Sequence, residues 1–420
     1  MSNQNIDQAA DPQPFSLASD PLSPLWQVRL LVGFLLLGIA ARGARYLLCF
    51  PLWDDETFLC ANFIGATYAD LLGRLNYHQV APILFLWAEL TAVKLFGFSE
   101  WSLRLIPFLC SLASLWLFHR LASRFIQGTP LVLAVGFLAA AYPGIRYAAE
   151  AKPYGTDLFV SLVLLNIFAN WYTAGRGCST GATRWLWLLV ALVPLAVGFS
   201  YPVVFLAGGL SLVVAYVLFI TRNASGVAPW LAFSLVLVLS FGGVLWLSAT
   251  QAHSELNFMR IHWASAFPPL SEPWKLPVWL VVVHASDLLG YPFGGPRGAS
   301  TATFLCFLAG LWFALRKRTS STDANASHEP REPHEQGEPR DLTFVLLCAA
   351  PLSLQMVAAA LQRYPYGGHV KFSQYVAPMI CMIAGCGLAY LIMLAHRTPK
   401  RGRLALTLGL AFLFVPGVGS

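Results

Sequence analysis

The chain has 420 residues, of which 57% are hydrophobic and only 11% are charged, and its mean hydropathy is +0.61. Soluble domains are roughly 45–50% apolar and about 25% charged, so the composition excludes a soluble globular protein and indicates a polytopic membrane protein. The net charge of +7 does not indicate nucleic acid as a partner. The basic residues form short clusters at the ends of apolar runs, where membrane lipid and topology explain them.

Apolar runs recur along the whole chain, and a helix needs about 20 such residues to cross a bilayer. Twelve candidates lie near residues 26–48, 78–97, 101–119, 130–146, 155–174, 184–201, 203–221, 229–250, 300–315, 342–361, 374–395 and 403–418. If all twelve crossed, the basic clusters at 120–124, 316–318 and 397–403 would lie opposite the N-terminus, against the positive-inside tendency. One segment is therefore expected not to cross.

The segment 78–97 is the best candidate to stay out of the membrane. It carries Glu89 and Lys94 in its middle and begins with His78 and Pro82. This pattern is typical of an amphipathic helix that lies at the interface. The sequence therefore predicts an all-α fold with about 11 transmembrane helices, a cytoplasmic N-terminus and further interfacial helices in the extracytoplasmic loops.

This topology divides the chain into parts that differ in composition. Residues 316–341 are rich in Pro, Glu and Ser without an apolar period, which is typical of disorder. The first residues are polar, and we do not expect them to form a cleavable signal. The expected parts are a disordered cytoplasmic N-terminus (1–25), a transmembrane module (26–315) with extracytoplasmic loops 50–100 and 251–299, a disordered cytoplasmic loop (316–341), and C-terminal transmembrane helices (342–420) with a basic extracytoplasmic loop at 362–373.

The eight cysteines lie mostly inside the apolar runs and form no C-x-x-C pair. They are expected to act as small apolar residues rather than as a disulfide framework or a zinc site.

The predicted topology brings four segments to the extracytoplasmic side, namely 50–78, 146–154, 251–299 and 362–373. Positive charge is disfavoured there, so the cations of these segments need another explanation, and anion binding is the simplest. The cations are Arg146, Lys152, Arg260, Lys275, Arg297, Arg363 and Lys371.

Four stretches carry a family resemblance. They read LWDDETFLCANF (52–63), NYHQVAPILFLWAELTAVKLFGFSEWSLRLIPFL (76–109), YAAEAKPYG (147–155) and RYPYGGHVKFSQYVAP (363–378). In order and spacing they resemble the polytopic GT-C glycosyltransferases that use polyprenyl-phosphate sugars, within the group of protein O-mannosyltransferases and lipid A aminoarabinose transferases. The resemblance covers roughly the first 175 residues and, more loosely, 362–378. Lys152 stands where the family usually has Arg, and Pro82 stands alone where two prolines are common.

The resemblance implies a glycosyltransferase whose catalytic module is 26–315. The enzyme would move a hexosyl or pentosyl group from a polyprenyl-phosphate donor to an extracytoplasmic acceptor, with inversion. Such transfer needs a base for the acceptor and cations for the leaving phosphate. Asp55 aligns with the family's catalytic carboxylate, Glu56 would position hydroxyl groups, and Asp54 is an additional acid. The residues expected to bind the donor or substrate are His78, Arg104, Glu150, Lys152, Tyr154, Arg260, Arg363 and Lys371.

Several of these residues also have a plainer interpretation, and for His78 it is an interfacial histidine that is hydrogen-bonded to water. The acidic triplet could cap a helix N-terminus, Glu150 and Lys152 could form a surface pair of little energetic value, and Lys371 with its tyrosines could anchor the chain at lipid headgroups.

The reaction class and its requirements also leave alternatives open. The three adjacent acids suit Mg²⁺ or Mn²⁺ but do not define an octahedral site, so the use of a metal ion stays open.

A lipid-linked saccharide transporter or flippase is the alternative function, although it would place charges near the bilayer midplane on several helices. The expected location is a bacterial-type inner membrane, with the active site facing outward. The acceptor, whether glycan, lipid or protein, is not readable.

Overall fold

The computed structural model describes residues 17, 20–174, 180–251, 261–294, 300–315, 342–396 and 399–418. Arg260, most of the expected N-terminal tail and the loop 316–341 lie outside the described residues. The described residues form helices and no β-strand, so the expected all-α fold is confirmed.

Each of the twelve apolar segments is helical, and 130–146 forms two helices rather than one. The long helices are α1 (Pro24–Leu47), α3 (Ile83–Phe96), α5 (Leu105–Phe125), α6 (Thr129–Ala139), α8 (Tyr154–Thr173), α9 (Thr183–Phe199), α10 (Val203–Thr221), α11 (Val227–Gln251), α14 (Thr301–Leu315), α15 (Thr343–Ala360), α16 (Ala377–Ala395) and α17 (Pro399–Val418). Shorter helices are α2 (Asp54–Cys60), α4 (Glu100–Leu103), α7 (Tyr142–Arg146) and α13 (Leu276–Val283).

Six described helices are long and apolar enough to cross a membrane, or seven if the bent pair α6 and α7 counts as one span. The six are Pro24–Leu47, Glu100–Phe125, Val203–Thr221, Ala224–Leu247, Thr343–Ala360 and Val370–Ala395. Because several other apolar helices fall short of this length or hydropathy, the expected eleven crossings stay a prediction.

The expected span 130–146 differs in shape from a straight crossing. It is broken into α6 (Thr129–Ala139) and the segment Tyr142–Ala149, which meet at a bend of 49°. Pro143 lies just after the break, and a proline cannot donate the backbone hydrogen bond that would continue α6. The break turns the chain toward Glu150 and Lys152.

Helix α16 forms the centre of the molecule. It is buried along nearly its whole length and packs against α14 and α6. Gly385 permits the approach of α6, because a Cβ there would lie 2.6 Å from Ala134 Cα. Small residues at such crossings allow helices in lipid to pack closely.

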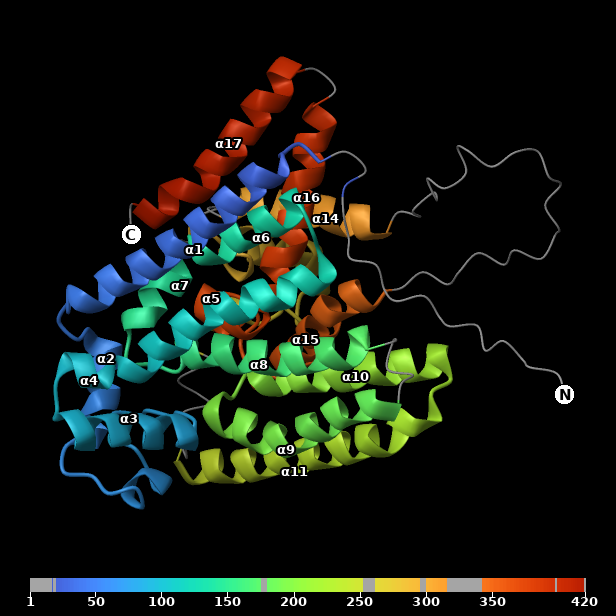
Figure 1. Ribbon diagram of the computed structural model, residues 1–420. Coiled ribbons are helices and arrows are strands. Elements are labelled where there is room, and N and C mark those ends of the chain that lie inside the picture. Colours follow the sequence, from blue (N-terminus) through green and yellow to red (C-terminus); the bar gives the residue numbers. More distant parts are fainter. Residues whose placement is uncertain are drawn as a thin grey trace, which may run out of the picture.

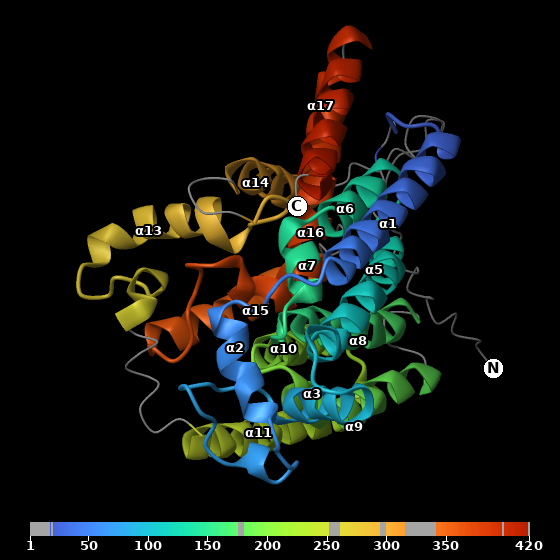
Figure 2. The ribbon, with the colours of Figure 1, turned by 90° about the vertical axis from the view of Figure 1, so that its left-hand side faces the viewer.

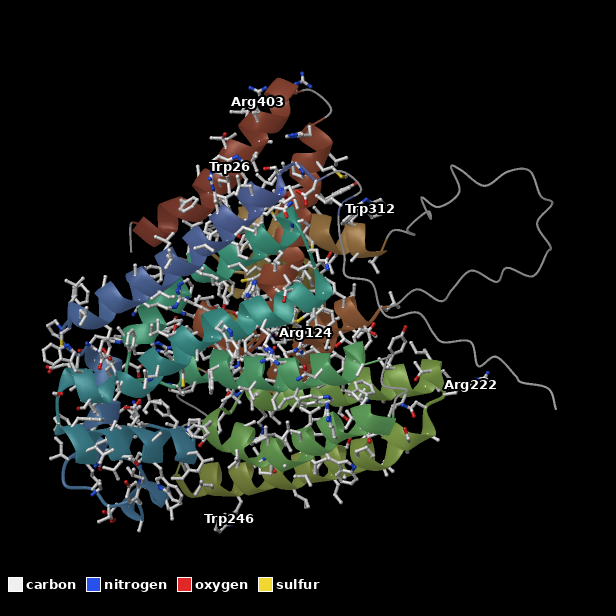
Figure 3. The ribbon with its side chains drawn as sticks, in the orientation of Figure 1. Trp26, Arg124, Arg222, Trp246, Trp312 and Arg403 are labelled. Carbon is white, nitrogen blue, oxygen red and sulfur yellow. The ribbon has the colours of Figure 1, made fainter. Side chains whose placement is uncertain are left out.

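The remaining helices form groups around this centre. Helices α8, α9, α10 and α11 run alongside one another, and α1 lies beside α17 (Figure 1). Large apolar side chains such as Trp246 and Trp312 are exposed on the outside of the bundle (Figure 3), as expected for a surface in contact with lipid.

Helices α2, α3 and α4 gather at one end of the molecule (Figures 1 and 2). Arg222 and Arg403 lie away from that end (Figure 3), a placement compatible with the predicted topology. Helix α3 buries Phe85, Leu86, Glu89 and Leu90 on one side, whereas Lys94 is exposed. Its acid therefore lies on the buried side, and Leu95 and Phe96 are exposed beside Lys94, so the amphipathic interfacial helix expected for 78–97 stays a prediction.

Candidate active site

The acidic triplet occupies the first turn of α2. Trp53 precedes the helix and donates its backbone N–H to Glu56 Oε2 at 3.4 Å. The plainer capping interpretation therefore holds for Glu56, and all three acids lie at the favourable end of the helix dipole. Their surroundings nevertheless differ, because Asp54 is exposed, Asp55 is half-buried and Glu56 is fully buried.

Glu56 is held by Arg104 in a bidentate pair. Arg104 donates from Nε to Glu56 Oε1 at 2.8 Å and from Nη2 to Glu56 Oε2 at 2.7 Å, and both side chains are almost completely buried. Arg104 Nη1 donates to the Phe50 carbonyl at 2.6 Å, and Glu56 Oε1 also accepts the Ala151 N–H at 2.7 Å. These contacts occupy most of the hydrogen-bonding capacity of the pair, so their geometry favours fixing the site over binding a ligand.

Asp55 is paired with Lys152, which lies 97 residues away in the sequence. Lys152 Nζ donates to Asp55 Oδ1 and to Gln79 Oε1, both at 2.7 Å. The Asp55 side chain is 29% exposed and that of Lys152 is 8% exposed. An ammonium group has three N–H donors, so Lys152 keeps one for a ligand.

Glu150 lies beside this pair and contacts Trp53 and Arg146. Trp53 Nε1 donates to Glu150 Oε1 at 2.8 Å, and Arg146 Nε lies 3.5 Å from Glu150 Oε2. Burial raises the pKa of Glu150 to about 7, against the opposing effect of Arg146. Glu150 therefore changes its charge near neutral pH.

The basic loop 362–373 completes the cluster with Lys371. Its ammonium group lies 4.8 Å from the centroid of the Trp263 ring, 5.5 Å from that of Phe372 and 5.7 Å from that of Tyr154. Among the described residues no carboxylate lies within ion-pair distance of it. Lys371 is thus a partly buried cation stabilised by aromatic faces.

His369 joins this loop to the segment that carries Glu150. Its Nδ1 accepts the Lys371 backbone N–H at 3.2 Å and lies 3.2 Å from the Tyr147 hydroxyl. Burial, with Lys371 and Arg146 nearby, lowers the pKa of His369 to about 4. The imidazole is therefore neutral at pH 7, and because Nδ1 accepts the backbone N–H, the proton lies on Nε2.

The structure brings most of the predicted site residues together. Contacts link three of the expected extracytoplasmic segments, and Trp263 adds the fourth. The predicted residues in this cluster are Asp55, Glu56, Arg104, Glu150, Lys152, Tyr154 and Lys371; Asp54 lies beside it on the same turn of α2.

Other predicted residues lie at its edge. His78 is exposed, with a left-handed backbone at φ 56°, and Arg363 is exposed at the start of its loop. Their contact with a donor stays a prediction, as does that of Arg260 outside the described residues.

The cluster also contains residues that the sequence reasoning did not assign to the site, namely Trp53, Gln79, Trp263 and His369. Three of them lie within or next to the recognised motifs: Trp53 precedes the acids, Gln79 follows His78, and His369 precedes Lys371 by two residues. Arg146 had been identified only as a cation on the expected outer side.

No group of three His, Cys, Asp or Glu side chains in the described part of the chain is placed to hold a metal ion. The described cysteines are free thiols.

Comparison with known proteins identifies the fold. No protein-family model and no curated protein sequence matches the chain. Among solved structures, ArnT from Cupriavidus metallidurans bound to undecaprenyl phosphate matches with a TM-score of 0.52 and 16% sequence identity, covering 89% of this chain and 64% of that one. This chain has the fold of ArnT. The expected GT-C-like architecture is therefore confirmed at the level of the fold.

Two structures of the Archaeoglobus fulgidus oligosaccharyltransferase are also similar, both at 12% identity. The apo form has a TM-score of 0.49, covering 94% of this chain and 56% of that chain. The complex of this enzyme, AglB, with an inhibitory peptide and a dolichol-phosphate has a TM-score of 0.46, covering 93% and 55%. The chain thus spans less than two thirds of each of these three matched chains.

Proposed function

We propose that the chain is an integral membrane glycosyltransferase that moves a sugar from a polyprenyl-phosphate donor to an acceptor outside the cytoplasm. The observation that carries the proposal is the position of Asp55, a half-exposed carboxylate, next to cations from separate segments. Lys152 contacts it directly, and Arg146 and Lys371 belong to the same cluster. The fold shared with ArnT, which was crystallised with undecaprenyl phosphate, supports the same conclusion.

The reaction follows from these residues. The acceptor hydroxyl or amine attacks the anomeric carbon of the donor sugar while the bond from that carbon to the phosphate oxygen breaks. Asp55 takes the proton of the acceptor through its second carboxylate oxygen, since its bond to Lys152 uses Oδ1. The bond electrons leave with the phosphate, whose charge Lys371, Lys152 and Arg146 stabilise. Attack from the face opposite the phosphate inverts the anomeric centre.

The remaining members position this machinery. Glu56 and Arg104 fix the first turn of α2 against Ala151, while Glu150 orients Arg146 and Tyr154 supports Lys371. The cluster lies at the α2–α4 end of the bundle, which we assign to the extracytoplasmic face of a bacterial-type inner membrane. The group that we propose is transferred is a hexosyl or pentosyl group. Dependence on Mg²⁺ or Mn²⁺ is tested by adding these ions or by chelating them.

A transporter for lipid-linked saccharides is the less favoured alternative. It would need ionisable side chains along a path through the membrane, whereas the charges of this cluster lie at helix ends and in the loops between them.

The test is sugar transfer by the purified protein in detergent, with undecaprenyl-phosphate sugars and a panel of acceptors. Asp55→Asn should abolish transfer but leave donor binding, because it removes proton acceptance and hardly changes shape. Asp54→Asn, its exposed neighbour, is the matched control and should be milder. Asp55→Asn with wild-type turnover would remove Asp55 as the base. Donor binding without transfer by the wild-type protein would favour the transporter.

A further inference from the structure

Arg42 in α1 is a completely buried arginine without a carboxylate partner among the described residues. Its Nε donates to Ser111 Oγ at 2.9 Å, and its Nη1 donates to the carbonyls of Gly38 at 3.0 Å and Ala139 at 2.8 Å. Its Nη2 donates to the Leu138 carbonyl at 3.3 Å. A buried charge that lacks such partners is strongly destabilising, so backbone carbonyls here replace a counterion.

The carbonyls that Arg42 contacts belong to the break between α6 and α7. Leu138 and Ala139 are the last two residues of α6. The final carbonyls of a helix lack partners within the helix and carry its partial negative charge. Arg42 therefore satisfies the end of α6 at the point where the chain bends by 49°.

Two glycines make room for this contact. A Cβ on Gly144 would lie 2.6 Å from Arg42 Nη2, and a Cβ on Gly38 would lie 3.0 Å from the Ala139 carbonyl oxygen. Ser111 extends the contact, because its hydroxyl donates to the Gly144 carbonyl at 3.2 Å. The guanidinium group is thus enclosed by α1, α5, α6 and α7.

The two chain segments that leave this joint carry the two halves of the candidate site. Helix α1 leads to Trp53, Asp55 and Glu56, whereas α7 leads to Arg146, Glu150 and Lys152. The halves meet again where Ala151 donates to Glu56 and Lys152 donates to Asp55.

We infer that Arg42 is a positioning residue, which keeps Asp55 and Glu56 of α2 aligned with the cations that follow α7. The inference rests on the proposed function only in what it says the site does. The relative position of α2 and the segment after α7 is a property of the fold.

The test is hydrogen exchange of the Ala151 amide, whose N–H is bonded to Glu56, in the full-length protein in detergent. Arg42→Gln should speed its exchange about tenfold or more, because the joint opens locally, while amides of α10 and α11 keep their protection. Arg42→Lys should restore part of the protection, since an ammonium group still reaches one or two carbonyls. If Arg42 were needed only for overall stability, its substitution would speed hydrogen exchange in all regions together, including α10 and α11.

Gly144→Ala provides a second variant if Arg42→Gln fails to fold, because its methyl group would lie 2.6 Å from Arg42 Nη2 and would displace the guanidinium group. Gly43→Ala is the matched control, since a Cβ at Gly43 meets nothing within 4 Å. Arg124→Gln is a second control, because Arg124 Nη1 also donates to a backbone carbonyl, that of Asn166, but at the other end of α5 (Figure 3).

Unchanged Ala151 exchange in Gly144→Ala, or equal acceleration in either control, would overturn the inference. Binding of undecaprenyl phosphate is measured separately on the wild-type protein. Failure to bind would contradict the proposed function and leave the exchange result standing.

Discussion

Arg104 and Lys371 are two cations of the same cluster with opposite surroundings. Arg104 is 4% exposed and makes a bidentate pair with a buried carboxylate. Lys371 lies over three aromatic rings and has no carboxylate partner among the described residues. A saturated cation fixes the backbone around it, whereas a cation held only by ring faces still has hydrogen-bond donors for an anion.

Two groups of residues can be distinguished in this way: residues that hold the site in shape and residues that bind the substrate. Glu56, Arg104 and Arg42 belong to the first group, because their polar atoms contact this chain itself. Asp55, Lys152 and Lys371 belong to the second, because each keeps capacity for a substrate. Substitutions in the first group should affect stability more than binding, and those in the second should do the reverse.

The largest effect is expected for Arg104→Met. Removal of one partner of a buried pair leaves the Glu56 charge uncompensated, which should lower the free energy of unfolding by roughly 3–5 kcal/mol. Thermal unfolding in detergent measures this change. Arg120→Met, at an exposed position of α5, is the control, and adding Glu56→Gln to Arg104→Met should recover part of the loss. If Arg104→Met melted at the same temperature as the wild type, Arg104 would not belong to the residues that stabilise the site.

Lys152→Met tests a residue of the second group, whose ammonium group donates to Asp55 and Gln79 and keeps a third N–H donor. Loss of a charge-assisted contact of about 1.5–3 kcal/mol should weaken undecaprenyl phosphate binding roughly ten- to a hundredfold. Lys152→Arg should be tolerated best, because Arg keeps the positive charge and is the residue usual at this motif position in the GT-C glycosyltransferases that the sequence resembles. Equal affinities of wild type and Lys152→Met would remove Lys152 from the donor site.

Glu89 on α3 is a buried acid whose two oxygens have no hydrogen-bond partner among the described residues. Burial, and secondarily Glu56, raises the pKa of Glu89 well above 4.5. Above pH 4.5 the unfolded state therefore loses a proton that the folded state keeps, so stability falls as pH rises. Glu89→Leu should raise stability by about 1–3 kcal/mol.

The gain from Glu89→Leu should be larger at pH 8 than at pH 6, as measured by thermal unfolding at both values. The exposed Glu100→Leu serves as control. A destabilised Glu89→Leu would show that the carboxyl group has a partner or a role of its own.

The smallest effect concerns Glu150, whose pKa near 7 makes the charge of the cluster depend on pH. Above pH 7 the ionised Glu150 competes with donor phosphate for Arg146. Wild-type affinity for undecaprenyl phosphate, divided by that of Glu150→Gln, should fall by a factor of about 1.4 to 5 from pH 6 to pH 8, since partly exposed pairs contribute about 0.2–1 kcal/mol. The ratio cancels the ionisation of the phosphate itself. A constant ratio would show that Glu150 does not titrate in this range.

The sequence was sufficient to predict the helices and the segments of the site. Apolar runs mark the helices because lipid requires apolar side chains and internally bonded backbone. The motifs around Asp55, Lys152 and Lys371 could be recognised locally, and these residues do lie in one cluster.

Pairings across the fold could not be predicted in this way. Arg104 and Glu56 are 48 residues apart, and Arg42 and Ala139 are 97 apart. Neither contact leaves a local pattern, because each depends on how helices pack. The break in 130–146 did have a signal, since Pro143 lies inside that expected span, but hydropathy alone does not register it.

The most direct test of the account is the affinity of the purified protein for undecaprenyl phosphate, measured by native mass spectrometry for the wild type, Lys371→Met and Lys275→Met. Lys275 is an exposed lysine paired with Glu272 in the expected outer loop 251–299. The account predicts that the wild type binds, that Lys371→Met loses roughly ten- to a hundredfold in affinity, and that Lys275→Met binds like the wild type. Equal binding by Lys371→Met and the wild type would contradict it.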